Sequence, residues 1–302
     1  MLDVCLLGTG GMMPLPDRKL TALMTRYNGS HLLIDCGEGT QVAIKEMGWS
    51  FKRIETICLT HYHADHIGGL VGLLSSMCNA AKTDTLTVIG PKGLDSLMFN
   101  VRALTPVLPF PVKLIEVTDK ECTLKVNGYT IDMFRVKHGL ICYGYSIRIP
   151  RLGKCDPAKA ERNCVPIEYW TRLQQGEVVH HRGRELSCDM ILGPARKGLK
   201  VTYCTDTRPV DSIVTYAADA DLFVCEGMYG SSDDLENACK YKHMIFSEAA
   251  ELAARAGVNR FWLTHYSPVL VHPAQFKDEL LRIFPKAELG FDGKHIELVY
   301  VD

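Results

Sequence analysis

Residues 59–70 read Leu-Thr-His-Tyr-His-Ala-Asp-His-Ile-Gly-Gly-Leu and hold four side chains that can bind metal, His61, His63, Asp65 and His66. The apolar residues before them predict the end of a strand, and residues 67–77 predict an apolar helix entered through two glycines. On an extended backbone His61 and His63 project to the same side, whereas Asp65 and His66 lie past the bend. The spacing therefore suits two adjacent metal ions better than one.

A chance cluster is the alternative interpretation of this stretch. An isolated His-x-His pair is often a surface feature or part of a hydrogen-bonded core. Four ligand-type residues within six positions, at a strand-to-helix turn, are much harder to explain in that way. We therefore interpret residues 61–66 as a metal-binding segment.

The composition predicts a globular protein without a membrane span. The chain has 302 residues, of which 47% are hydrophobic, and no apolar run approaches the roughly 18 residues that a spanning helix needs. The N-terminus enters a strand-like run without a basic region, so no signal peptide is predicted. Twelve cysteines are scattered without a regular framework, which indicates a reducing cytoplasm.

Charge is uneven along the chain although the net charge is only −1. Residues 148–200 contain eleven Lys and Arg against six Asp and Glu, a net charge of +5. This segment also has little apolar periodicity and several prolines and glycines. Such a segment inside a compact domain is usually functional or mobile. It is either a nucleic-acid footprint or a solvated basic loop.

A second block with possible function lies between a predicted hairpin and a predicted helix. The hairpin turns at Asn28-Gly29, a strong turn dipeptide, and is followed by Asp-Cys-Gly-Glu-Gly-Thr-Gln at residues 35–41. Acidic side chains at a strand end beside glycines suit the support of a metal-bound histidine, whose second ring nitrogen needs a partner. A simple turn is the alternative.

Ligand-type residues recur at the ends of predicted strands. His61, His138, Asp206 and His265 each follow an apolar strand-like run. Strands come first and then alternate with helices, in two similar halves, which predicts a layered α/β protein. Sites in such proteins assemble at the carboxyl edge of the sheet. We therefore expect the four residues to belong to one site.

Taken together, these motifs resemble the ribonuclease Z group of the metallo-β-lactamase-fold hydrolases, which are endonucleases that process the 3′ end of tRNA. The resemblance covers nearly the whole chain, and residues 35–41 are what favour ribonuclease Z over other members of the superfamily. The matching segments are residues 7–11 with Pro14, 33–41, 60–70, His138 before Gly144-Tyr145, 206–209 and 263–265.

The resemblance implies a four-layer αββα sandwich formed by a single domain, residues 1–302, with residues 148–197 as an inserted arm-like segment. It also implies two zinc ions, one bound by His61, His63 and His138 and the other by Asp65, His66 and His265, with Asp206 bridging. Imidazole and carboxylate ligands suit zinc, although manganese or iron could use the same set. Two such ions can share a hydroxide and clamp a phosphodiester.

Catalytic roles follow from the same resemblance. Asp65 would orient or deprotonate the attacking water, and His243 with Glu226 would stabilise the transition state or protonate the leaving oxygen. The chain departs from the family next to both His243 and Glu226. Cys-Glu-Gly-Met at residues 225–228 replaces the usual His-Glu-Ala-Thr, and Met-Ile follows His243 in place of small hydroxyl residues.

The implied function is removal of the 3′ trailer of precursor tRNA by a cytoplasmic homodimer. The arm-like segment would grip the tRNA, but it lacks the family's Gly-Pro motif. Together with the changes around Glu226 and His243, this favours an alternative, a phosphodiesterase acting on a small molecule such as a cyclic nucleotide. A non-catalytic nucleic-acid-binding protein is a third hypothesis, which the complete set of seven metal-ligand candidates disfavours.

Overall fold

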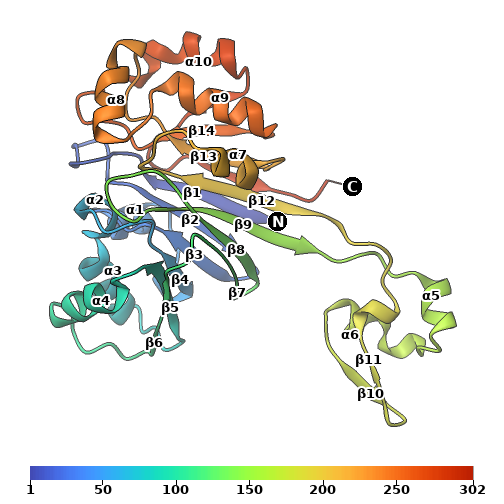
Figure 1. Ribbon diagram of the computed structural model, residues 1–302. Coiled ribbons are helices and arrows are strands. Elements are labelled where there is room, and N and C mark those ends of the chain that lie inside the picture. The colour runs from blue at the N-terminus through green and yellow to red at the C-terminus, as the bar shows by residue number, and fades with distance from the viewer. Residues whose placement is uncertain (302) are drawn as a thin grey trace. The chain divides into compact units, whose positions relative to one another are not determined.

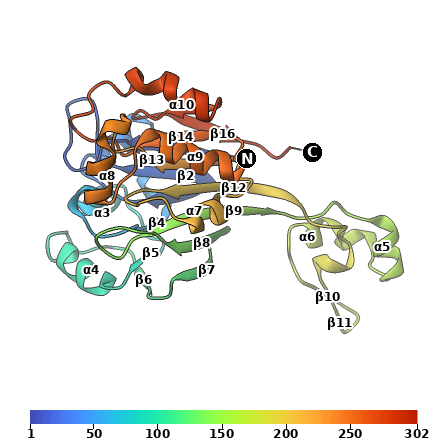
Figure 2. The same ribbon diagram turned by 45° about the horizontal axis from the view of Figure 1, so that its top comes forward.

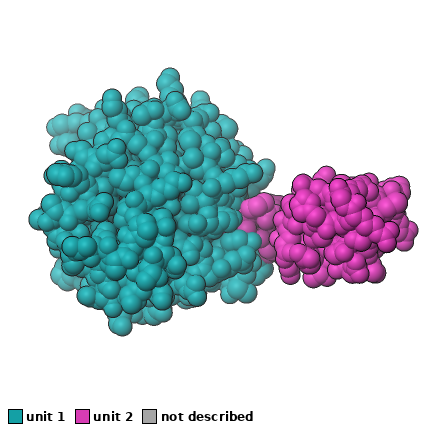
Figure 3. All heavy atoms as spheres, turned by 90° about the horizontal axis from the view of Figure 1, so that it is seen from below, with its two compact units in different colours: residues 1–148, 200–299 teal, residues 149–199, 300–302 magenta. Residues whose placement is uncertain are grey.

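The computed structural model describes residues 1–301 and divides them into two compact units. Unit 1 contains residues 1–148 and 200–299, and unit 2 contains residues 149–199 with 300–301, as coloured in Figure 3. Within the described residues, no helix is both long and apolar enough to cross a membrane.

Unit 1 is built on two seven-stranded mixed sheets. In the first sheet, the strands before β4 pair antiparallel and those from β3 to β6 pair parallel. In spatial order its strands are β16 (His295–Leu298), β1 (Leu2–Gly8), β2 (Ala22–Tyr27), β3 (Ser30–Ile34), β4 (Ile54–Cys58), β5 (Leu86–Pro91) and β6 (Val112–Val117).

The second sheet repeats this plan, with an antiparallel part joined to a parallel part. In spatial order its strands are β15 (Ala287–Leu289), β14 (Phe261–Thr264), β13 (Leu222–Glu226), β12 (Arg196–Cys204), β9 (Tyr143–Arg151), β8 (Tyr129–Arg135) and β7 (Glu121–Val126). The two similar halves expected from the order of elements are therefore present.

Helices cover the outer faces of the paired sheets, as Figures 1 and 2 show. On the first sheet lie α1 (Thr40–Glu46), α3 (Leu70–Asn79) and α4 (Leu94–Ala103), with the short α2 (Ala64–Ile67) and η1 (Phe51–Arg53). On the second lie α7 (Asp211–Ala217), α8 (Leu235–Tyr241), α9 (Phe246–Ala256) and α10 (Lys277–Ile283), with η4 (Ser232–Asp234) and η5 (Pro273–Phe276). The layers follow the αββα order that the resemblance implied.

The core follows from the sequence pattern of these elements. Helix α9 buries alanines such as Ala249, Ala250 and Ala253 on the face that packs against the second sheet. Their small side chains let the helix lie close to the strands, whereas α3 buries leucines against the first sheet. Burial of one such leucine stabilises the fold by roughly 1.5–3 kcal/mol. A buried hydrogen bond of 2.8 Å between the hydroxyls of Thr21 and Tyr203 links the two halves.

The helix predicted over residues 67–77 differs in one respect. The structure has two helices, α2 and α3, separated by Gly68 and Gly69. Asp65 and His66 therefore lie in the first turn of a short helix rather than in a loop. A four-residue helix is shorter than the window that hydrophobic periodicity needs, so the pattern could not reveal it.

Unit 2 has more regular structure than its sequence suggests. Its elements are α5 (Pro157–Arg162), η2 (Ile167–Tyr169), α6 (Trp170–Gln174), β10 (Val179–His181), β11 (Arg184–Leu186) and η3 (Cys188–Met190). They enclose a small core that includes Ala160, Leu173, Leu186 and Ile191. The sequence alone predicts a short helix over residues 169–175, and α6 lies within this range. The other elements are too short to give a readable period.

Candidate metal centre and active site

The carboxyl ends of the central strands bring together all seven residues that the sequence singled out as metal-ligand candidates. His61 follows β4, His138 follows β8, Asp206 follows β12 and His265 follows β14. Asp65 and His66 join them from α2, and His63 from the loop before it. The ligand-type atoms fall into three groups, of which His61, His63, His138 and Asp206 form the first and Asp65, His66 and His265 the second. The third group, Asp206, His243 and His265, shares one residue with each of the other two.

The first group contains His61, His63, His138 and Asp206. Their ligand-type atoms all lie within 4.8 Å of one another. Nε2 of His61 is 2.9 Å from Nδ1 of His63, which is 3.4 Å from Nε2 of His138. The Oδ1 atom of Asp206 lies 3.8 Å from Nε2 of both His61 and His138.

The second group contains Asp65, His66 and His265 and faces the other carboxylate oxygen of Asp206. Oδ2 of Asp206 lies 3.0 Å from Nε2 of His66 and 3.2 Å from Nε2 of His265. Oδ2 of Asp65 lies 3.5 Å from Nε2 of His265. Each oxygen of Asp206 thus faces one group, which is the arrangement of a carboxylate shared by two cations.

The chemistry of these donors fits divalent metal. Asp206 is only 2% exposed, and its Oδ2 has no well-aligned hydrogen bond within residues 1–301, although ring nitrogens of His66 and His265 lie 3.0 and 3.2 Å away. A buried carboxylate oxygen without an aligned donor is costly unless a cation satisfies it. The buried Nε2 atoms of His66 and His265 also lie 3.2 Å apart, which places two nitrogen ligands around one point. Imidazole and carboxylate groups at this spacing form a metal site.

Backbone strain marks the same residues. Asp35, Asp206 and His265 have φ values of +59°, +54° and +57°, in the left-handed region that residues other than glycine rarely adopt. Each follows a strand, so the chain turns sharply there and directs the side chain across the sheet edge. Such strain concentrates at functional sites because the surrounding structure holds it in place.

Asp35 supports one histidine from behind, as the sequence predicted for residues 35–41. Its carboxylate lies 2.8 Å from Nδ1 of His66 and accepts hydrogen bonds from the backbone N–H and hydroxyl of Thr60. Burial alone would lower the pKa of His66, but the carboxylates of Asp206 and Asp35 raise it well above its usual value. By contrast, burial and the neighbouring imidazole of His66 lower the pKa of His61.

The glycine-rich loop after β1 contributes a backbone donor that sequence reasoning missed. The N–H of Met12 donates a 2.7 Å hydrogen bond to Oδ2 of Asp65. A Cβ at Gly11 would lie 2.6 Å from the His265 ring, so only glycine lets the loop pass. A backbone donor has no side-chain signature, so sequence reasoning could not find it.

His243 and Glu226 form a pair beside the two groups. Nδ1 of His243 is 3.0 Å from Oε2 of Glu226 and 4.0 Å from Oδ1 of Asp206. Glu226 ends β13, is fully buried and accepts backbone hydrogen bonds from Thr207 and Met244. Burial alone would lower the pKa of His243, but the charge and hydrogen bond of Glu226 raise it to about 9. An imidazolium is therefore held next to the metal-ligand candidates at neutral pH.

A cleft of about 480 Å³ opens over this constellation. The candidate ligands His63, Asp65, His138, Asp206 and His265 line it together with His243. The remaining lining residues are Met12, Met228, Tyr229, Asn237, Tyr241, Ser267, Pro268 and Val269. The metal-ligand candidates and the His243–Glu226 pair thus share one opening.

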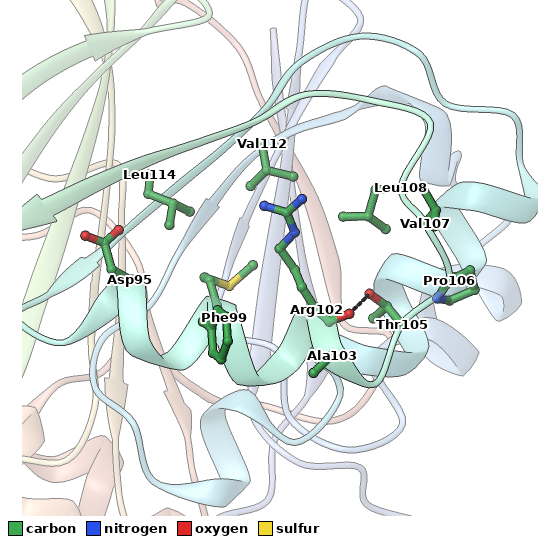
Figure 4. Close-up of a pocket in the computed structure, with 11 residues that line it drawn as sticks. Asp95, Phe99, Arg102, Ala103, Thr105, Pro106, Val107, Leu108, Val112 and Leu114 are labelled. Carbon is green, nitrogen blue, oxygen red and sulfur yellow. Dashed lines mark hydrogen bonds between the residues drawn. The ribbon is translucent and has the colours of Figure 1, made fainter.

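A separate cavity of about 560 Å³ lies between α4 and β6, shown in Figure 4. Its lining is mostly apolar, with Asp95 and Arg102 as its charged members and no histidine. It therefore offers no comparable metal site.

Comparison with solved structures first identifies the class of fold. The metallo-β-lactamase fold protein YhfI from Bacillus subtilis superimposes with a TM-score of 0.70 at 19% identity, covering 98% of each chain. A family model described as Anti-Pycsar protein Apyc1 matches residues 2–104, about a third of the chain. The fold and the His/Asp constellation define a metallo-β-lactamase-fold protein.

Full-length relatives then give the family. A ribonuclease Z from Lachnoclostridium phytofermentans is 58% identical over 99% of both chains. A second ribonuclease Z, from Lachnospira eligens, is 55% identical over 100% of this chain and 99% of its own length. The chain belongs to the ribonuclease Z family.

Proposed function

We propose that this protein is an endoribonuclease that removes the 3′ trailer of precursor tRNA with two zinc ions. Membership of the ribonuclease Z family makes it a metal-dependent hydrolase of RNA phosphodiester bonds. The observation that carries the two-ion proposal is Asp206, whose two oxygens face the two ligand groups. His61, His63 and His138 would hold one ion, and Asp65, His66 and His265 the other. Ions bound there would supply Lewis acidity and a water of lowered pKa.

Asp65 is proposed to orient the attacking water. Hydrogen bonding from Met12 and the imidazole of His265 hold its carboxylate in place beside the cleft. Burial alone would raise the pKa of Asp65, but His265 and His66 keep it below the usual value. The group is therefore ionised at neutral pH, so its carboxylate can orient the attacking water by accepting a hydrogen bond from it.

His243 is proposed to act on the leaving oxygen. Its imidazole lines the cleft, and Glu226 fixes Nδ1, which leaves Nε2 to face the substrate. A protonated imidazole can donate a hydrogen bond to the phosphorane and then a proton to the departing oxygen. Glu226 acts through His243, because both of its oxygens are already engaged by Thr207, Met244 and His243.

Unit 2 is proposed to bind the body of the tRNA as the arm of this enzyme. Residues 149–199 contain nine Lys and Arg against six Asp and Glu, and their own small core makes them a folded module rather than a loop. A basic surface of this kind would contact phosphates without reading sequence.

We also propose that the enzyme is a homodimer in the cytoplasm. The exposed apolar side chains Phe99, within α4, and Val107, after it, line the cavity in Figure 4, and Val107 is 97% exposed. Leu104, which directly follows α4, is also exposed. A second copy packed on this face would cover them. All twelve cysteines are free, which suits a reducing compartment. Sedimentation should show a dimer that the double substitution F99D and V107D converts to monomer.

One experiment separates this function from hydrolysis of a small phosphodiester. The zinc-loaded protein is offered a precursor tRNA and, in parallel, cyclic nucleotides and bis(p-nitrophenyl) phosphate, and the tRNA product end is mapped. Cleavage directly after the discriminator nucleotide, lost in Asp65→Asn and kept in the matched Asp95→Asn, supports the proposal. Intact precursor tRNA alongside hydrolysis of a small diester would leave only the alternative function.

A further inference from the structure

A second, smaller cavity adjoins the active-site cleft on the side of α8. Its volume is about 270 Å³. Five residues, Met228, Tyr229, Asn237, Ser267 and Val269, line both the cleft and this cavity. A substrate group placed there would therefore lie directly next to a phosphate held at the metal centre.

The wall between the two spaces is a rigid piece of backbone. The N–H of Ser267 donates to the carbonyl of Met228 at 3.1 Å. Tyr229 donates to the carbonyl of Met244 and accepts from the N–H of Phe246, at 3.3 and 2.9 Å. The segment that carries Met228 and Tyr229 is thus pinned to the strand end of His265 on one side and to the segment after His243 on the other.

The floor of the cavity is formed by close packing of an aromatic ring on a glycine. Phe276 packs directly over Gly230, where a Cβ would lie 2.1 Å from the phenyl ring. Any larger residue at that position would push the ring into the cavity. A rigid wall and an aromatic floor together give a preformed space.

The chemistry of the lining suits a nucleobase better than a phosphate. Asp234 is its only charged residue, and no Lys or Arg lines it. The aromatic rings of Tyr229 and Phe276 and the thioether of Met228 offer flat and polarisable apolar surface. Base-to-aromatic stacking of this kind is independent of sequence and is the common device of proteins that bind single-stranded nucleic acid.

Neutral hydrogen-bonding groups accompany that surface. Asn237 and Gln275 line the cavity, and both residues are exposed. Amides can pair with the donor and acceptor edge of a base. The volume lies below the roughly 300–1,000 Å³ typical of sites for whole ligands, so the space suits one base.

We propose that this cavity is a subsite for the base of a nucleotide that flanks the scissile phosphate, with Tyr229 as its stacking platform. The inference rests on the proposed action on precursor tRNA and deepens it.

The test is a double substitution, one in the enzyme and one in the substrate. Precursor tRNAs with an abasic residue on the 5′ or the 3′ side of the scissile bond are compared with the intact substrate. In the unaltered enzyme, one abasic position should lower kcat/KM about tenfold, as loss of one stacked base does. In Tyr229→Ala this penalty should vanish, and in Tyr229→Phe, which keeps the ring, it should remain. Asn100→Ala on α4 is the control.

The ratio of kcat/KM for the intact substrate to kcat/KM for the abasic substrate can be interpreted even if a substitution lowers the overall activity. General harm to the metal centre lowers cleavage of the intact and abasic substrates equally and leaves their ratio unchanged. An abasic penalty that is the same in Tyr229→Ala as in the unaltered enzyme, or no penalty at either position, would overturn the subsite. Failure of the unaltered enzyme to cleave intact precursor tRNA would instead overturn the proposed function itself.

Discussion

Asp206 is the residue on which the arrangement of the metal centre depends. Both of its carboxylate oxygens face imidazoles, and it holds a left-handed backbone conformation directly after β12. Removing its charge leaves two clusters of buried imidazoles without a shared anion. At this scale the structure explains why a carboxylate, and not a further histidine, is required.

Asp206→Asn should therefore reduce the metal bound per chain and lower kcat/KM on precursor tRNA by at least about a hundredfold, since even partners outside the ligand shell cost 10- to 100-fold. Elemental analysis and cleavage assays measure the two effects. Asp132→Asn is a matched control, because Asp132 is also buried but is paired with Arg148 and belongs to no ligand group. Full metal content in Asp206→Asn would contradict the account.

Glu226 governs the protonation of His243. The pKa of His243 is raised to about 9, so the imidazolium predominates below that pH and is lost above it. Activity that needs this proton should fall as pH rises through about 9. In Glu226→Gln the carboxylate is gone and burial lowers the pKa, so the alkaline limb should move to lower pH.

A pH profile of kcat/KM measures the position of that limb. Glu288→Gln is the control, because the ion-pair partner of Glu288 is Lys294 and not His243. An alkaline limb at the same pH in Glu226→Gln and in the unaltered enzyme would show that His243 does not supply the proton.

Among elements, the two loops that edge the cleft are joined by Arg18. Its guanidinium donates to the carbonyls of Leu270 and Val271, at 3.0 and 3.3 Å, and lies over the ring of Tyr266. The first loop carries Met12, and the second follows His265. Arg18 thus fixes the width of the cleft without touching the metal-ligand candidates.

Arg18→Ala should loosen both loops and raise KM for precursor tRNA more than it lowers kcat. Arg18→Lys should recover little, because an ammonium cannot reproduce the planar fork that reaches several carbonyls. Steady-state kinetics separates the two constants, with Arg255→Ala, which removes an exposed ion pair, as control. A drop in kcat at unchanged KM would refute the role of Arg18 in substrate positioning.

Elements also show how far the sequence alone could lead. Residues 61–66, His138, Asp206 and His265 could be found because ligand-type residues after apolar strands stand out against their neighbours. The N–H of Met12 could not, since any residue supplies a backbone donor. The break between α2 and α3, and the short elements of unit 2, lie below the length at which periodicity is informative.

At the scale of the whole molecule, the metal-ligand candidates and the basic segment proposed to bind tRNA lie in different units. All metal-ligand candidates lie in unit 1, whereas residues 149–199 carry a net positive charge and their own core. The strands β9 and β12 that lead to unit 2 are paired within the second sheet, so unit 1 does not need residues 154–195 to complete its layers.

Replacing residues 154–195 by a short Gly-Ser linker should raise KM for precursor tRNA at least about tenfold and flatten its salt dependence, because fewer phosphates are neutralised. Titration of KM against salt measures both effects. Hydrolysis of bis(p-nitrophenyl) phosphate reports whether unit 1 is intact. If KM for precursor tRNA and its dependence on salt are unchanged, unit 2 does not bind the tRNA.

The most direct test of the central claim is cleavage of precursor tRNA measured against zinc bound per chain. The metal-free protein is titrated with zinc, and bound metal and initial rate are recorded at each step. The account predicts that the rate of cleavage after the discriminator nucleotide reaches its maximum at two zinc ions per chain. Full activity with one ion or none would contradict it.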